Sequence, residues 1–262
     1  GSVGDGLYKL DFNKLTVQNY DLSEIISTLN LPPYVTHLTE NEQGQIYISI
    51  NRIGLFRFYP ETGKSVRLLT SVLSKQASIS ALTHIKQTNK LLYALEGEDE
   101  VNICAYGPDG MLIGESKFVI DEYNRQENAI HALFEDSKGN IWIGANSGIY
   151  LKPKGGKSRL FSRNYSFVNS FTEDKHKNIW FGTAKEGVFY ASQKIVNRRN
   201  IYFITSVPLK IDNFRSVNVQ SVCSTPKGDT YIGTREGCLF RYNTNERKAI
   251  DISGLYGITE EG

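Results

Sequence analysis

Short apolar segments alternate with polar turns along this chain of 262 residues. In the clearest example, Ile130 to Tyr150, an apolar segment ends in an acidic turn, a second is rich in β-branched and aromatic residues, and a third follows a short loop. Segments of this length and composition, bounded by Gly, Asn and Asp, are typical of β-strands joined by tight turns. The pattern therefore predicts an antiparallel sheet in each such stretch.

The same pattern occurs five times along the chain. Its turns return at roughly 40 to 50 residues, the length of a propeller blade. A fourth strand is expected after polar turns such as Pro60–Gly63. A small sheet with two apolar faces cannot bury both by itself, whereas radial stacking of such sheets covers them. The sequence thus predicts an all-β fold, a β-propeller of four-stranded antiparallel blades. The five whole blades are expected near residues 35–70, 79–120, 130–163, 168–205 and 219–252.

The two ends of the chain resemble parts of one further repeat. Residues 1–20 match the part of a repeat that follows its second strand, and residues 255–262 match a first strand with its acidic turn. A natural domain is not expected to end inside a repeat. We therefore expect residues 1–20 and 255–262 to form a split sixth blade of one propeller domain, residues 1–262, and the chain to be an excerpt of a longer polypeptide.

The motif of an acidic turn followed by Gly-Asn-Ile-Trp-Ile-Gly is strongest in residues 130–150 and 168–190. This motif resembles the two-component regulator propeller repeat. The resemblance implies an extracytoplasmic, periplasmic sensor of a membrane histidine kinase, of the hybrid kind that responds to polysaccharide breakdown products, and a homodimer in the full-length receptor. The sequence departs from the family pattern at Lys177, which replaces the turn glycine, and in residues 79–106, where the core motif is lost.

Charge and hydropathy exclude some partners. The formal net charge is +2, and basic residues are scattered rather than gathered into the stripe that nucleic-acid binding requires. The most basic stretch, Lys194–Arg199, is interpreted as a solvated loop. No apolar run reaches the ~20 residues that span a bilayer, so membrane attachment is expected only through flanking segments outside this sequence.

Cysteine, histidine and acidic residues form no recognisable metal or catalytic set. The odd number of cysteines, Cys104, Cys223 and Cys238, predicts buried free thiols rather than a disulfide framework. The acidic pairs Glu135–Asp136 and Glu173–Asp174 recur in the repeats, as turn chemistry does, and lack the ligand spacing of a calcium loop. We expect no catalytic residue, no metal and no cofactor. The histidines, none at zinc spacing, are His37, His84, His131 and His176.

Trp142 and Trp180 occupy the same position of two repeats, in the middle of the second strand. Stacking on a sugar is one use for such aromatic residues, and packing of one blade against the next is the other. Their place in mid-strand favours packing, so both indoles are predicted to be buried.

The loops between the second and third strands, here called the B–C loops, vary in charge and shape inside a fixed frame of glycines. A rigid scaffold with variable loops is where binding specificity usually lies. A polar column at the start of each first strand, with His131 among its members, is a candidate lining for a central channel. The candidate ligand-binding residues are Asn51, Arg52, His131, Asn146, Ser147, Lys185, Glu186, Arg235 and Glu236.

The leading functional hypothesis is a ligand-sensing propeller that binds an oligosaccharide or a periplasmic partner domain and catalyses no reaction. Two other functions stay open. One is a propeller lyase, because the streptogramin lyases are similar to this repeat in their second-strand motif, although the metal-assisted His and Glu that they require cannot be assigned here beyond His131. The other is a protein-interaction propeller with no small ligand.

Overall fold

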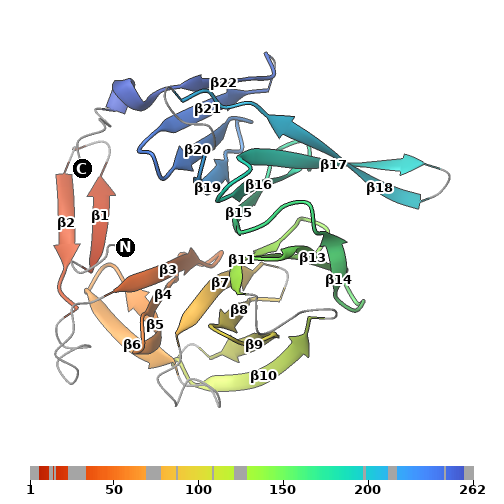
Figure 1. Ribbon diagram of the computed structural model, residues 1–262. Helices are drawn as coiled ribbons and strands as arrows, with labels where there is room; N and C mark the ends of the chain where they lie inside the picture. Colours follow the sequence, from red (N-terminus) through yellow and green to blue (C-terminus); the bar gives the residue numbers. More distant parts are fainter. Residues whose placement is uncertain are drawn as a thin grey trace. The chain divides into compact units, whose positions relative to one another are not determined.

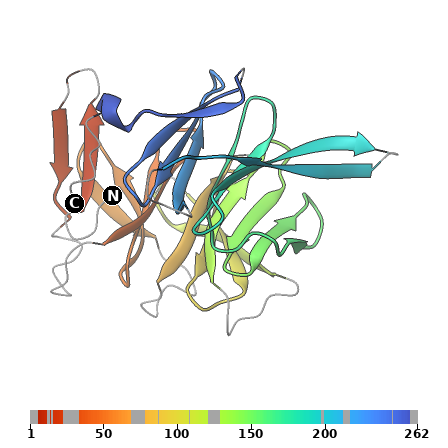
Figure 2. The same cartoon turned by 45° about the horizontal axis from the view of Figure 1, so that its top comes forward.

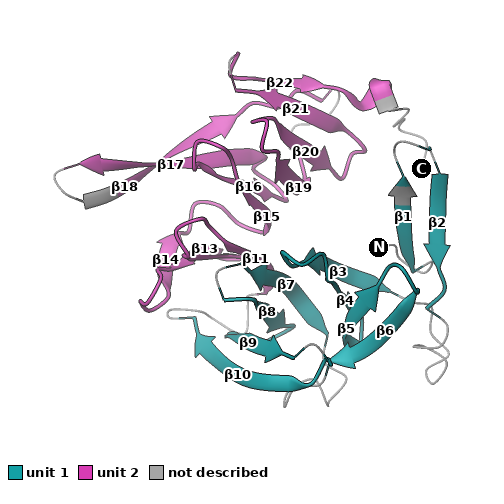
Figure 3. Cartoon of the chain, turned by 180° about the vertical axis from the view of Figure 1, so that it is seen from behind, with its two compact units in different colours: residues 1–120 teal, residues 121–262 magenta. Residues whose placement is uncertain are grey.

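The computed structural model is an all-β protein in two compact units, residues 1–120 and 121–262 (Figure 3). The structure describes residues 6–11, 14, 16–22, 34–68, 78–86, 88–107, 109–120, 129–196, 199–211, 217–244 and 246–256. Within these ranges the strands form five four-stranded sheets and one two-stranded sheet, all antiparallel (Figure 1). Each four-stranded sheet pairs its strands in chain order, so each is a propeller blade with strands A to D. The predicted β-propeller fold is confirmed.

The first unit holds two blades and the two-stranded sheet. Strands β1 (Leu7–Asp11) and β2 (Thr16–Tyr20) form the small sheet. Its side chains join the core of the first blade, where the Tyr20 hydroxyl donates a hydrogen bond to the carbonyl of Pro60. The first blade has β3 (Val35–Glu40), β4 (Ile46–Ile50), β5 (Gly54–Tyr59) and β6 (Lys64–Leu68), and the second has β7 (Ile79–Ile85), β8 (Lys90–Leu95), β9 (Glu100–Tyr106) and β10 (Leu112–Val119).

The second unit holds three successive blades and a final 3₁₀ turn, η2 (Ser253–Tyr256). Of the predicted split blade, the β1–β2 pair is present, whereas residues 1–5 and 257–262 lie outside the described residues. The three blades are β11 (Ile130–Glu135), β12 (Ile141–Ala145), β13 (Gly148–Lys152) and β14 (Arg159–Ser162); β15 (Val168–Glu173), β16 (Ile179–Thr183), β17 (Val188–Val196) and β18 (Arg199–Val207); and β19 (Val219–Ser224), β20 (Thr230–Thr234), β21 (Leu239–Asn243) and β22 (Lys248–Asp251).

Every strand A carries a register shift against strand B at its second position. Such a bulge leaves one residue without a paired partner in the ladder and turns its side chain away from the regular alternation. The bulged residues are the members of the polar column that the sequence singled out: Thr36, Ser80, His131, Asn169 and Gln220.

The glycine at the end of strand B has a packing reason. A Cβ at Gly144 would lie 2.6 Å from the carbonyl oxygen of Val168, the first residue of the next blade. A Cβ at Gly182 would lie 2.4 Å from Cγ1 of Val219, which begins the blade after that. Glycine therefore lets the inner strand of each following blade approach closely, and this contact repeats at both blade interfaces of the second unit.

The acidic turn and the tryptophan of the motif form one unit. Asp136 accepts hydrogen bonds from the backbone amides of Lys138 and Asn140, from the side chain of Asn140, and from Trp142 Nε1 at 3.0 Å. Asp174 binds Trp180 Nε1 at 2.9 Å and makes the same turn contacts. Both indoles are at most 2% exposed. The predicted burial of the tryptophans is confirmed, and their hydrogen bond to the turn is a feature that the sequence reasoning missed.

Lys177 takes a left-handed backbone conformation, with φ at 65°, where the corresponding turn of the preceding blade has Gly139 with φ at 79°. The side chain at this position therefore tolerates the strain that a glycine would avoid. Lys177 therefore replaces the glycine of the family pattern without changing the conformation of the turn.

Two expectations were wrong. The stretch from Lys194 is not a loop, because β17 and β18 continue as a hairpin in which Val196 pairs with Arg199. This hairpin extends beyond the other strands of its sheet (Figure 2). Of the three free cysteines only Cys104 is buried, whereas Cys238 is half-buried and Cys223 is exposed. Cys223 lies on the first strand of the last blade, β19, where the side chains of successive residues point to opposite faces and not all are covered, which explains the exposed thiol.

Candidate ligand-binding site

The B–C loops of the second unit lie at the same end of their blades as the bulged residues of strand A. We call this end the loop surface, and its central group combines a histidine, an amide, an aromatic ring and a cation. His131 Nε2 donates a hydrogen bond to Asn146 Oδ1, which fixes the two side chains together. The ring of Phe167 stacks on that of His131, with 6.4 Å between the ring centres. Lys185 belongs to the next B–C loop, and its Nζ lies 4.5 Å from the centre of the Phe167 ring. The sequence predicted three members of this group and missed Phe167.

Phe167 is held in an unusual backbone conformation, with φ at 50°. Its amide donates to the carbonyl of Asn146, and its carbonyl accepts from Ala184, so it ties one B–C loop to the next. A positive φ is uncommon for a bulky residue and costs on the order of 1–3 kcal/mol. The aromatic ring is thus placed between two loops by backbone contacts on both sides.

The remaining predicted residues of the second unit serve mainly to order their loops. Glu186 accepts a hydrogen bond from Ser166 Oγ at 2.7 Å, and its amide is capped by Thr183. Ser147 contacts the hydroxyl of Tyr150 at 2.9 Å. Glu236 Oε1 accepts from the amide of Asn218, while its Oε2 is buried with no hydrogen-bond partner in the described part of the chain.

Arg235 is exposed, and its amide donates to the carbonyl of Asn218. Asn218 Oδ1 in turn accepts from the bulged residue Gln220 at 2.6 Å. The bulged Asn169 donates to the carbonyl of Val219 in the following blade at 3.0 Å. Asn169 of the polar column therefore links two neighbouring blades at the loop surface.

Asn51 and Arg52 belong to the first unit. Asn51 Oδ1 accepts a hydrogen bond from Ser78 Oγ at 2.9 Å, and Arg52 is exposed with φ at 58°. Nearby, the bulged Thr36 shares a 2.7 Å hydrogen bond with Ser49, which also contacts His37. Burial lowers the pKa of His37, and the backbone hydrogen bond of Ser80 partly offsets this effect.

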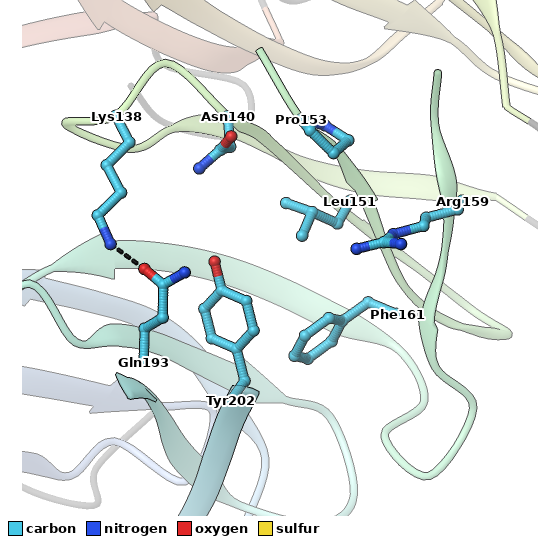
Figure 4. A pocket seen from close by; sticks show the side chains of 8 residues that line it. All are labelled: Lys138, Asn140, Leu151, Pro153, Arg159, Phe161, Gln193 and Tyr202. Atoms are coloured by element: carbon cyan, nitrogen blue, oxygen red, sulfur yellow. Dashed lines mark hydrogen bonds between the residues drawn. The ribbon is translucent and has the colours of Figure 1, made fainter. Parts of the chain in front are cut away.

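Two pockets lie at the opposite end of the same blades, near the A–B turns. The first, the Lys138 pocket, has a volume of about 310 Å³ and is crossed by a hydrogen bond from Lys138 to Gln193 (Figure 4). Its walls are Lys138, Asn140, Leu151, Pro153, Arg159, Phe161, Gln193 and Tyr202. None of the residues predicted from the sequence lines it.

The second, the Trp180 pocket, lies between the last two blades and measures about 600 Å³. It also contains none of the predicted site residues. Burial raises the pKa of Tyr242 in its wall, with further contributions from Tyr190 and, in the opposite direction, from Arg247. The phenol therefore stays protonated at neutral pH and can donate a hydrogen bond. The lining residues are Asp174, His176, Asn178, Trp180, Tyr190, Ser192, Lys194, Phe203, Thr205, Tyr242, Thr244 and Arg247.

The described ranges hold no cluster of three or more His, Cys, Asp or Glu side chains that could bind a metal ion. In those ranges no helix is long and apolar enough to cross a membrane. His131 is the one histidine that the sequence could assign under the lyase alternative, and its described hydrogen-bond partner, Asn146, is an amide, which cannot act as its acid or base.

The fold is that of several solved β-propellers. Virginiamycin B lyase from Staphylococcus aureus matches with a TM-score of 0.67 at 11% identity, covering 95% of this chain and 77% of that one. The extracellular domain of BT3049 from B. thetaiotaomicron, described as a hybrid two-component system, matches with a TM-score of 0.62 at 18% identity, covering 91% of this chain and 31% of that one. PorZ of Porphyromonas gingivalis matches with a TM-score of 0.63 at 12% identity, covering 95% of this chain and 39% of that one. At these identities the likeness shows the fold alone.

No curated protein matches the chain by sequence. The family described as two component regulator propeller matches residues 124–147 and 162–185, which include the two B–C loops joined by Phe167. Residues 124–147 and 162–185 thus match two-component regulator propeller repeats, and the resemblance that the motifs predicted is confirmed for these two repeats.

Proposed function

We propose that this chain is the ligand-sensing propeller of a two-component sensor histidine kinase, located in the periplasm, and that it binds a glycan fragment on the loop surface without transforming it. The observation that carries the proposal is the bulge in every strand A. An identical backbone device presents a different polar residue in each blade, next to loops that also differ. Constant strand geometry with varied polar residues at the bulges and loops is suited to recognition, because packing does not determine which residues these positions must carry.

The central group of the loop surface has the chemistry for sugar recognition. The Phe167 ring supplies a face on which the apolar side of a sugar can pack. Beside it, Lys185 supplies a hydrogen-bond donor, and His131, whose Nε2 donates to Asn146, offers Nδ1 as an acceptor. The His131–Asn146 bond orders both side chains before a ligand arrives. Such preorganisation reduces the conformational entropy lost on binding.

A sensor must also pass its state to the rest of the receptor. Phe167 joins two B–C loops through backbone hydrogen bonds, so a ligand on its ring would contact two blades at once. In the proposed receptor a homodimer carries these propellers, and a ligand that favours one arrangement of the dimer shifts the equilibrium read by the kinase. A periplasmic partner domain bound to the loop surface would act by the same linkage.

The test is calorimetric titration of a panel of oligosaccharides into the purified chain and three variants. Phe167→Gly removes the ring and suits the positive φ, so the backbone conformation is kept. Lys185→Gln removes the cation. Lys157→Gln, in the exposed turn between β13 and β14, is the matched control. We expect one class of oligosaccharide to bind, with the affinity reduced by roughly 1–3 kcal/mol in the first two variants and unchanged in the control.

Three results would overturn the proposal. Binding that is equal in Phe167→Gly and the wild type would place the ligand elsewhere. Absence of binding across the panel would favour the protein-interaction propeller. Cleavage of a ligand that depends on a divalent metal would favour the lyase.

A further inference from the structure

The Trp180 pocket is not explained by the proposed function, because it lies at the end of the blades opposite the loop surface. Its walls come from the A–B turn and strands β16, β17 and β18 of one blade, and from β21 and the following turn of the next. It is about twice the size of the Lys138 pocket at the preceding interface, about 600 against about 310 Å³. A volume of this order accommodates one small-molecule ring with substituents.

Aromatic side chains form the floor and one side of this pocket. Trp180 packs edge-on against Tyr242 at 4.8 Å and lies tilted at 4.9 Å from Tyr190. Phe203, on the projecting hairpin, is 46% exposed although it is a large apolar residue. An aromatic ring left open beside a cavity is a platform on which a flat or ring-shaped ligand can stack.

Positive charge is in excess around the same cavity. Lys194 Nζ lies 5.3 Å from the centre of the Phe203 ring, and Arg247 lines the pocket from the turn of the neighbouring blade. Within the described ranges neither side chain belongs to an ion pair. The carboxylate in the wall, Asp174, already accepts four hydrogen bonds, from its turn and from Trp180. Its charge is therefore committed to the fold, and the two cations are left to face an incoming group.

The described walls of the Lys138 pocket have no comparable open aromatic ring, and its lysine is already hydrogen-bonded. There Lys138, on the A–B turn, is bound to Gln193 across the opening, and Phe161 and Tyr202 both pack edge-on against Trp142, at 5.0 and 5.4 Å. The aromatic residues of the first interface are used for packing, whereas at the second interface Phe203 and the cations remain available.

We propose that the Trp180 pocket is a second ligand site, which takes a small ring that bears a carboxylate. The ring packs against Phe203 and Tyr190, and the carboxylate faces Lys194 and Arg247. The hydroxyls of Ser192, Thr205 and Thr244 in the same walls provide hydrogen bonds for ring substituents. This site is independent of the loop surface. A carboxylated ring can be a sugar acid or an aromatic acid, and the experiment distinguishes the two.

The test is calorimetric titration of the chain with glucuronate, 4-hydroxybenzoate and glucose. We expect one of the two acids to bind and glucose not to bind at the same concentrations. Arg247→Gln and Lys194→Gln should each weaken that acid about tenfold or more, which corresponds to loss of one charge-assisted hydrogen bond. Arg159→Gln, a cation of the Lys138 pocket, and Lys157→Gln, in the exposed turn between β13 and β14, are the matched controls and should bind as the wild type does.

A second measurement locates the bound acid. The chain has two tryptophans, so Trp142→Phe leaves Trp180 as its single indole. Titration of the acid should change the fluorescence of this variant. Both cation variants lie on exposed or partly exposed positions, and circular dichroism will verify that they fold. The proposal is overturned if neither acid binds, if glucose binds equally well, or if the two cation variants bind as tightly as the wild type.

Discussion

The Lys138 pocket and the Trp180 pocket are built on the same repeat, but side chains fill the first more completely than the second. At the first interface Trp142 is enclosed by Phe161, Phe171 and Tyr202, and a lysine-to-glutamine hydrogen bond spans the opening (Figure 4). At the second, Trp180 has aromatic neighbours at Tyr190 and Tyr242 but lines a larger cavity.

The comparison separates what the repeat requires from what each interface adds. The turn carboxylate and the indole make the same hydrogen bond at both interfaces, and the strand-B glycine at each lies against the first residue of the next blade. The outer strands C and D differ, and they determine whether the space beside the indole is filled. The motif thus encodes packing of the inner strands, and the outer strands are where an interface can gain a pocket.

The largest effect is expected from removal of the two indoles. Trp142→Ala should lower the free energy of unfolding by about 3–5 kcal/mol, because a fully enclosed aromatic side chain is lost. Trp180→Ala should lower the free energy of unfolding by about 3 kcal/mol, the lower end of this range, because water from the adjacent cavity can enter the vacated space. Chemical denaturation of both variants measures the difference. A larger loss for Trp180→Ala would contradict the distinction between a filled and an open interface.

The strand-B glycines provide a sharper test of what the interfaces share. A Cβ at position 144 would meet a backbone oxygen, whereas at position 182 it would meet the Val219 side chain. Both substitutions by alanine should destabilise the chain by roughly 1–3 kcal/mol through overpacking. Gly144→Ala should be the worse of the two, because backbone moves less readily than a side chain. Gly155→Ala is a poor control since φ there is 72°, so Gly114→Ala, with open space around its Cβ, serves instead.

Alkaline pH should weaken both interfaces through their tyrosines. Burial raises the pKa of Tyr202 and of Tyr242, with Asp136 adding to the rise for the former and Arg159 opposing it. Above the ordinary tyrosine pKa of about 10, the unfolded chain loses these protons while the folded chain keeps them, so stability falls as pH rises. Denaturation midpoints from pH 8 to 11 should therefore decline less in the double variant Tyr202→Phe and Tyr242→Phe than in the wild type. An identical decline would show that neither phenol is protected.

The smallest effect is expected from the cations. Lys138→Gln removes the hydrogen bond that crosses the first pocket, and exposed pairs of this kind contribute about 0–1 kcal/mol. Lys194→Gln and Arg235→Ala should change the free energy of unfolding by under ~0.5 kcal/mol, since both side chains are exposed. A large loss in any of the three would mean that the cation supports the fold rather than a ligand.

The strands of each blade were predictable from the sequence, and the contacts between outer strands of neighbouring blades were not. The glycine, indole and acidic turn recur with fixed spacing, so their column positions identify blades, buried tryptophans and the polar residues at the bulges. Phe167 was missed because its role depends on a positive φ and on contacts to two loops distant in sequence. The projecting hairpin was mistaken for a loop because a polar, basic strand has no apolar alternation to reveal it. Pockets between blades depend on which outer side chains meet, and no single repeat contains that information.

The function proposed for this chain is binding without turnover, and one measurement tests it directly. An oligosaccharide that gives a calorimetric response is incubated with the chain, with a divalent metal or with a chelator, and recovered for mass spectrometry. We predict a binding heat that is the same under both conditions, an unchanged ligand mass, and loss of affinity in Phe167→Gly. A product of altered mass that forms with metal and disappears with the chelator would contradict the account and identify the chain as an enzyme.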